Sequence, residues 1–363
     1  MRTGRDINGF PHSKYMHNFM RAGGERRGGI ERLRGIPPEE RPLNEILHCG
    51  FVVIDKPAGP TSHEVVSWVK DILGVKKASH TGTLDPKVTG VLPGLLGSAT
   101  KLMDFFVGGE KEYVCVMHIH DDFNEEDLKR VCEEFTGEIY QRPPLKSAVR
   151  RRIRVRKVHY IRVNEIEGRD VLLTVGCEAG TYIRMLCHHI GLALGVGAHM
   201  LQLRRTKAFP FTEEDCVRLH DLKDAFVFWE ENGEASLLRE YVRPVEDALF
   251  RMNLPFVVVK DTAVDAICHG ASLYAPGVLR VSEGLEKGAR SILLTQRGEI
   301  IAVGTAEMSR EEMLNANEGV CVRVHKVLLK RKTYPSVWKR RKQKKEEAEG
   351  SSSGVKKEEG KKS

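Results

Sequence analysis

The stretch from Ser79 to Lys101, SHTGTLDPKVTGVLPGLLGSATK, contains a single carboxylate, Asp85, among turn-forming residues. Its four glycines and two prolines predict a rigid series of turns rather than a helix or a long strand. Glycine lets the backbone approach other groups closely, and His80 and two threonines add hydrogen-bonding groups beside the acid. The stretch is suited to hold one carboxylate in a fixed, crowded place. From these residues alone, an ordinary Asp-Pro turn is the simpler interpretation.

Three further side chains stand on or beside predicted strands and helices. Lys56 ends a predicted buried strand that begins at residue 51, Tyr113 lies on a predicted strand over 111–119, and Arg184 lies where a predicted helix begins. A neighbouring guanidinium keeps a carboxylate ionised, and an aromatic face can stack on a nucleic-acid base. Each residue also has an ordinary interpretation: a solvated lysine at a strand end, a half-buried strand tyrosine, and a first-turn helix arginine in solvent.

The best local signal for nucleic-acid binding lies between residues 139 and 160. If residues 148–158 form a strand, alternation places four arginines on one face and Ile153 and Val155 on the other, the arginines being Arg150, Arg152, Arg154 and Arg156. Four neighbouring guanidinium groups repel one another unless anions lie across them, and phosphates suit their forked geometry. A solvated edge strand with gatekeeping charges is the alternative, but such an edge needs only one or two charges.

The length of 363 residues predicts two domains. Residues 1–50 are polar and predict an N-terminal extension with little core of its own, or else a disordered tail. Thr61 and Glu64 have the spacing of a capping box, and Asn124 is placed to cap a second helix. Residues 255–330 predict a small β-barrel, in which Asp261 caps a short helix, residues 291–305 form a hairpin and three alternating valines form the last strand. The sequence therefore predicts an α+β domain over 51–250, followed by the barrel.

Composition limits the remaining possibilities. The net charge of +8 lies in the ends, because residues 339–363 carry ten basic and five acidic residues and residues 1–50 carry nine and six. No long apolar run or signal core occurs, so we expect no membrane span and no secretion. None of the eight cysteines forms a C-x-x-C pair, which favours a reducing compartment over a zinc site or a disulfide framework. His188 and His189 have no third metal ligand at a suitable spacing, so no metal is expected.

HTGTLDP, followed by TGVL and ATK, closely resembles the central motif of the TruB-type pseudouridine synthases. KPAGPTS, GTYIR and MLQLRRTKAFPF resemble three further motifs of that family, and AVDAICHGASLYAPGVLR resembles the RNA-binding PUA domain. The match covers roughly residues 40–338 and is closest to the dyskerin branch, the catalytic subunit of box H/ACA ribonucleoprotein particles. It implies a mixed, mainly antiparallel sheet flanked by helices, and an N-terminal extension packed on the PUA domain through Leu43, Ile46 and Leu47.

The resemblance also implies roles for individual residues. Asp85 is expected to be the catalytic carboxylate, Arg184 to pair with it, and Tyr113 to stack on the target base. The remaining expected contacts to substrate come from Lys56, His80, Tyr182 and Leu203. PPLKSAV resembles a mobile thumb loop that closes over RNA. Whether Asp85 attacks the sugar or removes a proton from it is open.

The implied function is RNA-guided isomerisation of uridine to pseudouridine in ribosomal and small nuclear RNA. No cofactor is expected, because breaking and remaking the bond between base and sugar involves no redox change. The expected partners are a box H/ACA guide RNA, the substrate RNA and three small core proteins, without membrane or DNA. The lysine-rich tail over 339–363 is expected to be disordered, and it favours the nucleus and nucleolus. A stand-alone transfer-RNA synthase and a non-catalytic RNA-binding scaffold are the alternatives.

Overall fold

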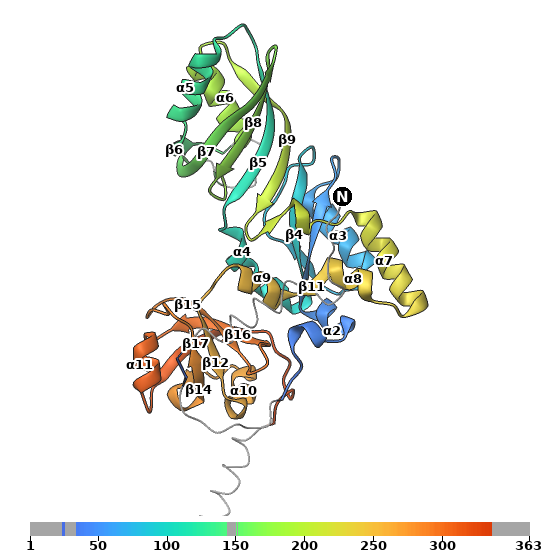
Figure 1. Ribbon diagram of the computed structural model, residues 1–363, viewed down its shortest axis with the longest axis vertical. Coiled ribbons are helices and arrows are strands. Elements are labelled where there is room, and N and C mark those ends of the chain that lie inside the picture. Colours follow the sequence, from blue (N-terminus) through green and yellow to red (C-terminus); the bar gives the residue numbers. More distant parts are fainter. Residues whose placement is uncertain (1–23, 26–33, 144–149, 151, 336–363) are drawn as a thin grey trace, which may run out of the picture. The chain divides into compact units, whose positions relative to one another are not determined.

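The computed structural model describes residues 24–25, 34–143, 150 and 152–335. The chain divides into two units, one formed by residues 42–248 and the other by residues 1–41 together with 249–363 (Figure 1). Each unit has its own sheet and helices, which confirms the predicted α+β class. No helix in the described ranges is long and apolar enough to cross a membrane.

The unit of residues 42–248 is organised by a sheet of ten described strands. Eight of them follow the order β11, β2, β4, β9, β5, β8, β7, β6, while β3 pairs with β4 and β10 with β9. Only β4 and β9 run parallel, so the predicted mixed, mainly antiparallel sheet is confirmed. The strands are β2 (Gly50–Lys56), β3 (Ala78–His80), β4 (Thr89–Leu96), β5 (Lys111–Ile119), β6 (Gly137–Gln141), β7 (Arg154–Glu167), β8 (Asp170–Cys177), β9 (Ala198–Ala208), β10 (Phe211–Thr212) and β11 (Val242–Pro244).

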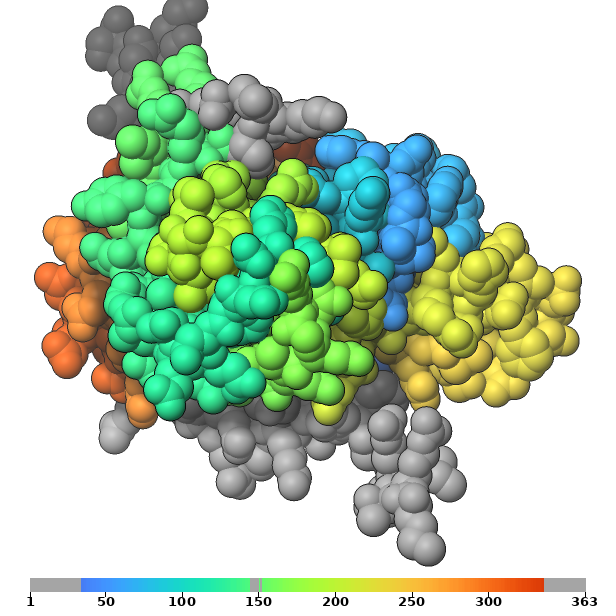
Figure 2. All heavy atoms as spheres, turned by 90° about the horizontal axis from the view of Figure 1, so that it is seen from above, coloured from blue at the N-terminus to red at the C-terminus, as the bar shows by residue number. Residues whose placement is uncertain are grey.

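Helices cover this sheet in two groups, each with its own apolar core. One core joins α5 and α6 to β5, β7 and β8, and the other joins α2, α3, α7 and α8 to β2 and β4. Figures 1 and 2 show the second group, with α3 in blue and α7 in yellow side by side. The helices are α2 (Leu43–His48), α3 (Ser62–Ile72), α4 (Met103–Val107), α5 (Glu125–Glu134), α6 (Ile183–Ala193), α7 (Leu219–Asn232), α8 (Ser236–Tyr241) and α9 (Val245–Arg251), with 3₁₀ turns η2 (Gly97–Leu102) and η3 (Glu213–Asp215).

The predicted helix starts are confirmed by their hydrogen bonds. Thr61 and Glu64 form the reciprocal capping box at the start of α3. The Asn124 side chain accepts from the backbone N–H groups of Glu126 and Asp127 at the start of α5. These contacts satisfy N–H groups that a helix leaves unpaired in its first turn, so short polar side chains fix where both helices begin.

The stretch around Asp85 differs from the expectation of turns throughout. Residues 89–96 form the buried strand β4, which pairs with β2 along one edge and with β3 and β9 along the other. Sheet partners on both sides outweigh the weak strand propensity of glycine and proline. Gly90, at φ 100°, lets β4 lie against β9, because a Cβ there would come within 2.2 Å of the Arg205 carbonyl oxygen. The turns are confined to residues 81–88.

The second unit has a sheet of seven described strands in the order β1, β14, β12, β15, β16, β17, β13. The predicted hairpin over 291–305 is confirmed by β15 and β16, and the predicted last strand by β17. The elements are η1 (Pro38–Glu40), β1 (Gly24–Glu25), β12 (Phe256–Val259), α10 (Asp261–Cys268), β13 (Leu273–Tyr274), η4 (Ala275–Gly277), β14 (Val278–Val281), β15 (Arg290–Leu294), β16 (Ile300–Ala306), α11 (Arg310–Asn315) and β17 (Val320–Val327).

The N-terminal segment has two separate attachments. Strand β1 pairs with β14, and the Arg34 N–H donates to the Asp261 carboxylate at 3.3 Å, both within the second unit. The Asp261 carboxylate also accepts from Gln296. Helix α10 begins at Asp261 and its N-cap is Lys260, so the prediction that Asp261 caps this helix is wrong. The expectation for Leu43, Ile46 and Leu47 is wrong. These side chains lie on α2 and belong to the apolar core of residues 42–248.

Candidate active site

The turn that carries Asp85 is fixed through its backbone. The hydroxyl of Ser62, the first residue of α3, accepts from Leu84 N–H at 2.8 Å and donates to Leu84 O at 3.0 Å. Val88 N–H donates to the Asp85 carbonyl at 3.0 Å, which closes a turn around the carboxylate. Because Ser62 is fully buried, these bonds are shielded from water and hold the turn against α3.

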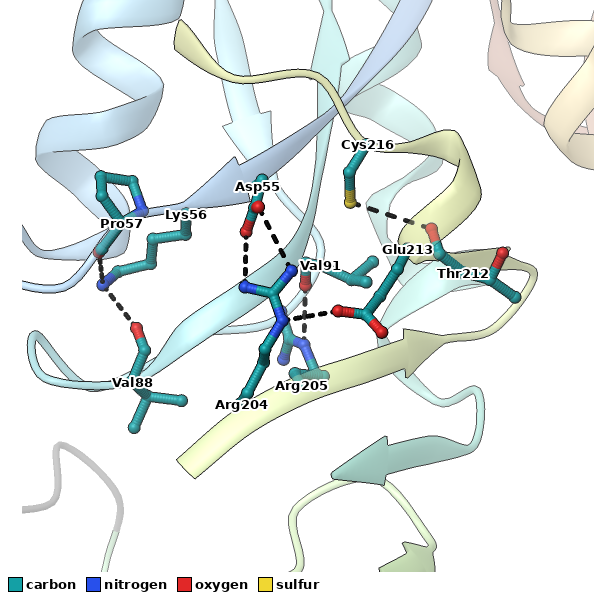
Figure 3. A network of polar contacts seen from close by, with 10 residues as sticks. All are labelled: Asp55, Lys56, Pro57, Val88, Val91, Arg204, Arg205, Thr212, Glu213 and Cys216. Atoms are coloured by element: carbon teal, nitrogen blue, oxygen red, sulfur yellow. Dashed lines mark hydrogen bonds and ion pairs between the residues drawn. The ribbon is translucent and has the colours of Figure 1, made fainter. Parts of the chain in front are cut away.

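Lys56 lies beneath the same turn and is completely buried. Its ammonium donates to the carbonyl oxygens of Pro57, Pro86 and Val88 at 2.9, 2.9 and 2.8 Å (Figure 3 shows the bonds to Pro57 and Val88). Burial lowers the pKa of Lys56, while the negative charge of Asp85 opposes that change. The lysine is therefore not a solvated strand-end residue. It uses all three of its donors, and two of them hold the Pro86 and Val88 carbonyls, which follow Asp85 in the turn.

The structure brings Asp85 and Arg184 together. The Arg184 Nη2 group donates to Asp85 Oδ2, and the side chains are 46% and 54% exposed. The carboxylate is thus more open than the crowded setting that the sequence suggested. Its turn is fixed by bonds to backbone groups, which leaves the side chain at the surface. A nucleotide can reach the pair from solvent.

Tyr113 and Leu203 lie beside this pair on adjacent strands. Leu203 on β9 opposes Cys115 on β5, two residues beyond Tyr113, so both side chains share one face of the sheet. They belong to one apolar cluster with Leu84 and Ile183, the neighbours of Asp85 and Arg184 in sequence. Burial raises the pKa of Tyr113, and the nearby positive charge of Arg205 opposes that rise. The phenol is therefore neutral at physiological pH.

Tyr182 and His80 complete the predicted site residues in this unit. Tyr182 precedes α6, where its N–H donates to Gln141 Oε1 at 2.9 Å and its carbonyl accepts from Gln141 Nε2 at 3.1 Å. His80, on β3, packs edge-on against His63 with ring centroids 4.8 Å apart. Burial, His63 and Arg205 lower the pKa of His80 to about 4. Its two buried ring nitrogens have no hydrogen-bond partner in the described chain.

The predicted stripe of four arginines is only half formed. Strand β7 begins at Arg154, so Arg150 and Arg152 lie before it, and the Arg152 N–H donates to the Arg150 carbonyl at 2.9 Å. Arg154 and Arg156 share the half-buried face of β7, opposite Gln141 and Ile139 of β6. Ile153 and Val155 are 60% and 42% exposed. The thumb loop expected at residues 143–149 lies almost wholly outside the described residues.

Sequence reasoning missed three residues that shape this site: Ser62, Gln141 and Arg205. Each is buried and each bonds to backbone groups from a distant segment. Arg205 stands in the motif MLQLRRTKAFPF, and on a strand two adjacent arginines must point to opposite faces. That alternation was an available signal that one of them faces inward.

The arrangement places one carboxylate, paired to a guanidinium and open to solvent, next to a neutral phenol and an apolar side chain. Such a site can bind a planar base and act on the sugar that carries it. Among the described side chains, no group of three histidine, cysteine or acidic residues is suited to hold a metal ion.

Four family models match the chain. The TruB family pseudouridylate synthase (N terminal domain) matches residues 70–183, and the tRNA pseudouridylate synthase B C-terminal domain matches residues 184–250. The DKCLD (NUC011) domain matches residues 30–66, and the PUA domain matches residues 255–328. Asp85, Tyr113, Tyr182 and Ser62 fall within these matches.

Relatives and solved structures from several sources cover most of the chain. A "Probable tRNA pseudouridine synthase B" of Methanopyrus kandleri is 56% identical over 304 residues, 84% of this chain and 89% of the relative. A Cbf5-Nop10-Gar1 complex contains a chain that is 50% identical, with a TM-score of 0.79 over 86% of this chain and 95% of that one. An H/ACA RNP bound to a substrate RNA containing 2′-deoxyuridine contains one that is 47% identical, with a TM-score of 0.78 over 86% and 96%. The chain therefore belongs to the TruB family of pseudouridine synthases, which are isomerases, in the dyskerin branch that ends in a PUA domain.

Proposed function

We propose that the chain is the catalytic subunit of a box H/ACA particle, in which a guide RNA selects the uridine to be isomerised. The observation that carries the catalytic role is the ion pair between Asp85 and Arg184, open to solvent beside buried Tyr113. The solved structures reported above support the guided form, because one is an H/ACA RNP and the other is a complex with Nop10 and Gar1.

The proposed reaction begins with a uridine flipped out of its stack. Asp85, paired with Arg184, acts on the nucleoside, and the bond between N1 of uracil and C1′ of ribose breaks. Tyr113 and Leu203 hold the detached base while it rotates. A bond then forms between C5 and C1′, C5 loses its proton and N1 gains one. The product has the same atoms as the substrate, so no oxidant or reductant takes part.

RNA is proposed to lie across the face that carries Arg154 and Arg156. Arg156 is close to the GTYIR segment, because a Cβ at Gly180 would lie 3.1 Å from its Nε.

Guide RNA, substrate RNA and three small core proteins are the proposed partners. Isomerisation in ribosomal and small nuclear RNA, and the nuclear and nucleolar location, stay predictions. The relative reported above comes from an archaeon.

A stand-alone transfer-RNA synthase is the second candidate, because the curated relative bears that name. Both candidates are tested by assembling the purified chain with partner proteins and guide RNA, and by measuring pseudouridine in a guide-matched substrate. The chain alone is assayed in parallel on transfer RNA without a guide. Turnover that requires the guide supports our proposal, while robust guide-free turnover favours the second candidate. If wild-type protein makes no pseudouridine in either assay but binds guide RNA, it is a scaffold.

A further inference from the structure

Arg205 on β9 is a buried cation with no acidic partner. Its side chain is 1% exposed. Its Nε group donates to the Val91 carbonyl at 2.8 Å and its Nη2 group to the Gly82 carbonyl at 3.1 Å (Figure 3 shows the first bond). No carboxylate is among its hydrogen-bond or ion-pair partners in the described chain. Burying a charge without a counter-ion costs free energy, so the burial of Arg205 against two backbone carbonyls needs a structural or functional explanation.

Arg204, the preceding residue, has the opposite environment. Its guanidinium donates to the Asp55 carboxylate at 2.9 and 3.2 Å and to Glu213 at 2.5 Å (Figure 3). Adjacent residues on a strand point to opposite faces of the sheet. Arg204 is therefore a conventional paired arginine on the same strand, and it provides a matched comparison.

The two carbonyls that Arg205 holds flank the Asp85 turn, one near its start and the other in β4, just after it. Gly82 precedes Asp85 by three residues, and Val91 follows it by six. Between them, Ser62 holds Leu84 and Lys56 holds Pro86 and Val88, in the contacts described above. The planar guanidinium fixes the directions of its donors relative to one another, which a flexible ammonium cannot do. One rigid group thus sets the distance between the two carbonyls.

Arg205 also lies beside the tyrosine expected to hold the base. Its Cα is the cross-strand partner of Tyr113 in the pairing of β9 with β5. On its other side β9 pairs with β4, directly after the Asp85 turn. The residue therefore lies between Asp85 and Tyr113, the two groups whose separation decides whether a bound nucleotide can react.

We propose that Arg205 is a positioning residue, which holds Gly82 and Val91 at a fixed separation and so places the Asp85 carboxylate relative to Tyr113 and the target nucleotide. This inference rests on the proposed function of the site. A displacement of about 1 Å in such a site can cost about 100-fold in rate. Arg205 acts through the turn and makes no contact of its own with the substrate.

The test compares Arg205→Lys with the matched control Arg204→Lys in the full particle. Lysine keeps the charge, but its single nitrogen cannot donate to the Gly82 and Val91 carbonyls with the fixed geometry of a guanidinium. We expect Arg205→Lys to slow single-turnover pseudouridine formation by about 100-fold, with unchanged affinity for substrate RNA. Hydrogen exchange at the turn amides, including Val88 N–H, should rise in Arg205→Lys only. Arg204→Lys should keep the wild-type rate and wild-type exchange in the turn.

Three results would overturn the inference. They are a wild-type rate in Arg205→Lys, an equal loss of rate in both variants, and a loss of rate without faster exchange in the turn. Failure of Arg205→Lys to fold, seen as a lost thermal transition in circular dichroism, would also overturn it by assigning Arg205 to sheet stability. If wild-type protein is inactive, the proposed function fails. The comparison of exchange between the two variants still tests whether Arg205 positions the turn.

Discussion

Arg184 and Asp85 are 99 residues apart in the sequence, and the Arg184 guanidinium donates directly to the Asp85 carboxylate. Neither residue belongs to a long-range pattern that periodicity could reveal. One stands at the apex of a turn between two strands, and the other in the first turn of α6. Their meeting depends on β4, β9, β5 and β8 lying in consecutive order, so the sheet itself assembles the pair.

Asp85→Asn should abolish product formation and leave RNA binding intact. The amide has nearly the same shape but has no negative charge with which to act on the nucleoside. The loss should be at least about 1,000-fold, the scale seen when an essential group is removed. The measurement is single-turnover pseudouridine formation, with guide-RNA affinity measured by filter binding. Asp224→Asn, an exposed aspartate on α7, is the matched control and should be fully active. A catalytically competent Asp85→Asn variant would refute the role of Asp85.

Arg184→Gln should lower activity strongly while changing stability little. Both partners of this ion pair are about half exposed, and exposed pairs contribute about 0–1 kcal/mol to folding. The thermal midpoint should therefore stay close to that of wild type. The rate of the chemical step should fall, because Asp85 loses the group that holds its charged form in place. A large drop in the thermal midpoint with a normal rate in the folded fraction would assign Arg184 to structure.

Lys56→Met should mainly lower the stability of the fold, whereas Arg184→Gln should mainly lower the rate. The substitution leaves three carbonyls without their donor, two of them in the Asp85 turn. An unsatisfied buried polar group costs about 1–3 kcal/mol, so the free energy of unfolding should drop by about 3 kcal/mol. Urea denaturation at neutral pH gives this value. A drop below about 0.5 kcal/mol would show that the turn does not depend on the lysine.

Lys111 gives a prediction on pH. Its side chain is buried beside Arg205, and burial lowers its pKa from 10.5 to about 8. Above pH 8 the folded state releases this proton while the unfolded chain keeps it up to its own pKa near 10.5. The free energy of unfolding therefore gains a rising contribution across that window as pH increases. Urea denaturation from pH 7.5 to 10.5 should show this rise in wild type and not in Lys111→Met. Parallel pH curves for the two proteins would contradict the assigned pKa.

Much of the fold follows from local patterns in the sequence. Strand β5 alternates buried and less buried residues over its whole length. The capping residues of α3 and α5 indicate where both helices begin. The errors have a common cause. Strand β4 is rich in glycine and proline, and only its partners on both edges make it a strand. The predicted arginine stripe included Arg150 and Arg152 because arginines continue to alternate with other residues in the sequence before β7 begins at Arg154.

The site was predictable only in part. Its motif residues came from family resemblance, whereas Ser62, Gln141 and Arg205 act on backbone groups 22, 41 and 123 positions away. The adjacent arginines indicate that one of the two faces inward, but not which one or what it contacts, and the serine and the glutamine have no local signature at all. The choice between their solvent-exposed and buried environments is made by tertiary packing, which no short window of sequence contains.

Arg154→Gln and Arg156→Gln should weaken RNA binding without changing the rate of the bound complex at saturation. Both side chains lie on the half-buried face of β7, and Arg156 approaches the loop before α6. Each lost phosphate contact should reduce the dependence of log K on log salt by about 0.7–0.9. Titrations from low to moderate salt give that slope. Arg130→Gln is the control, because this exposed arginine of α5 already pairs with Asp127 and Glu134. If all three variants show the wild-type slope, the β7 arginines do not contact phosphates, and RNA must follow another face of the sheet.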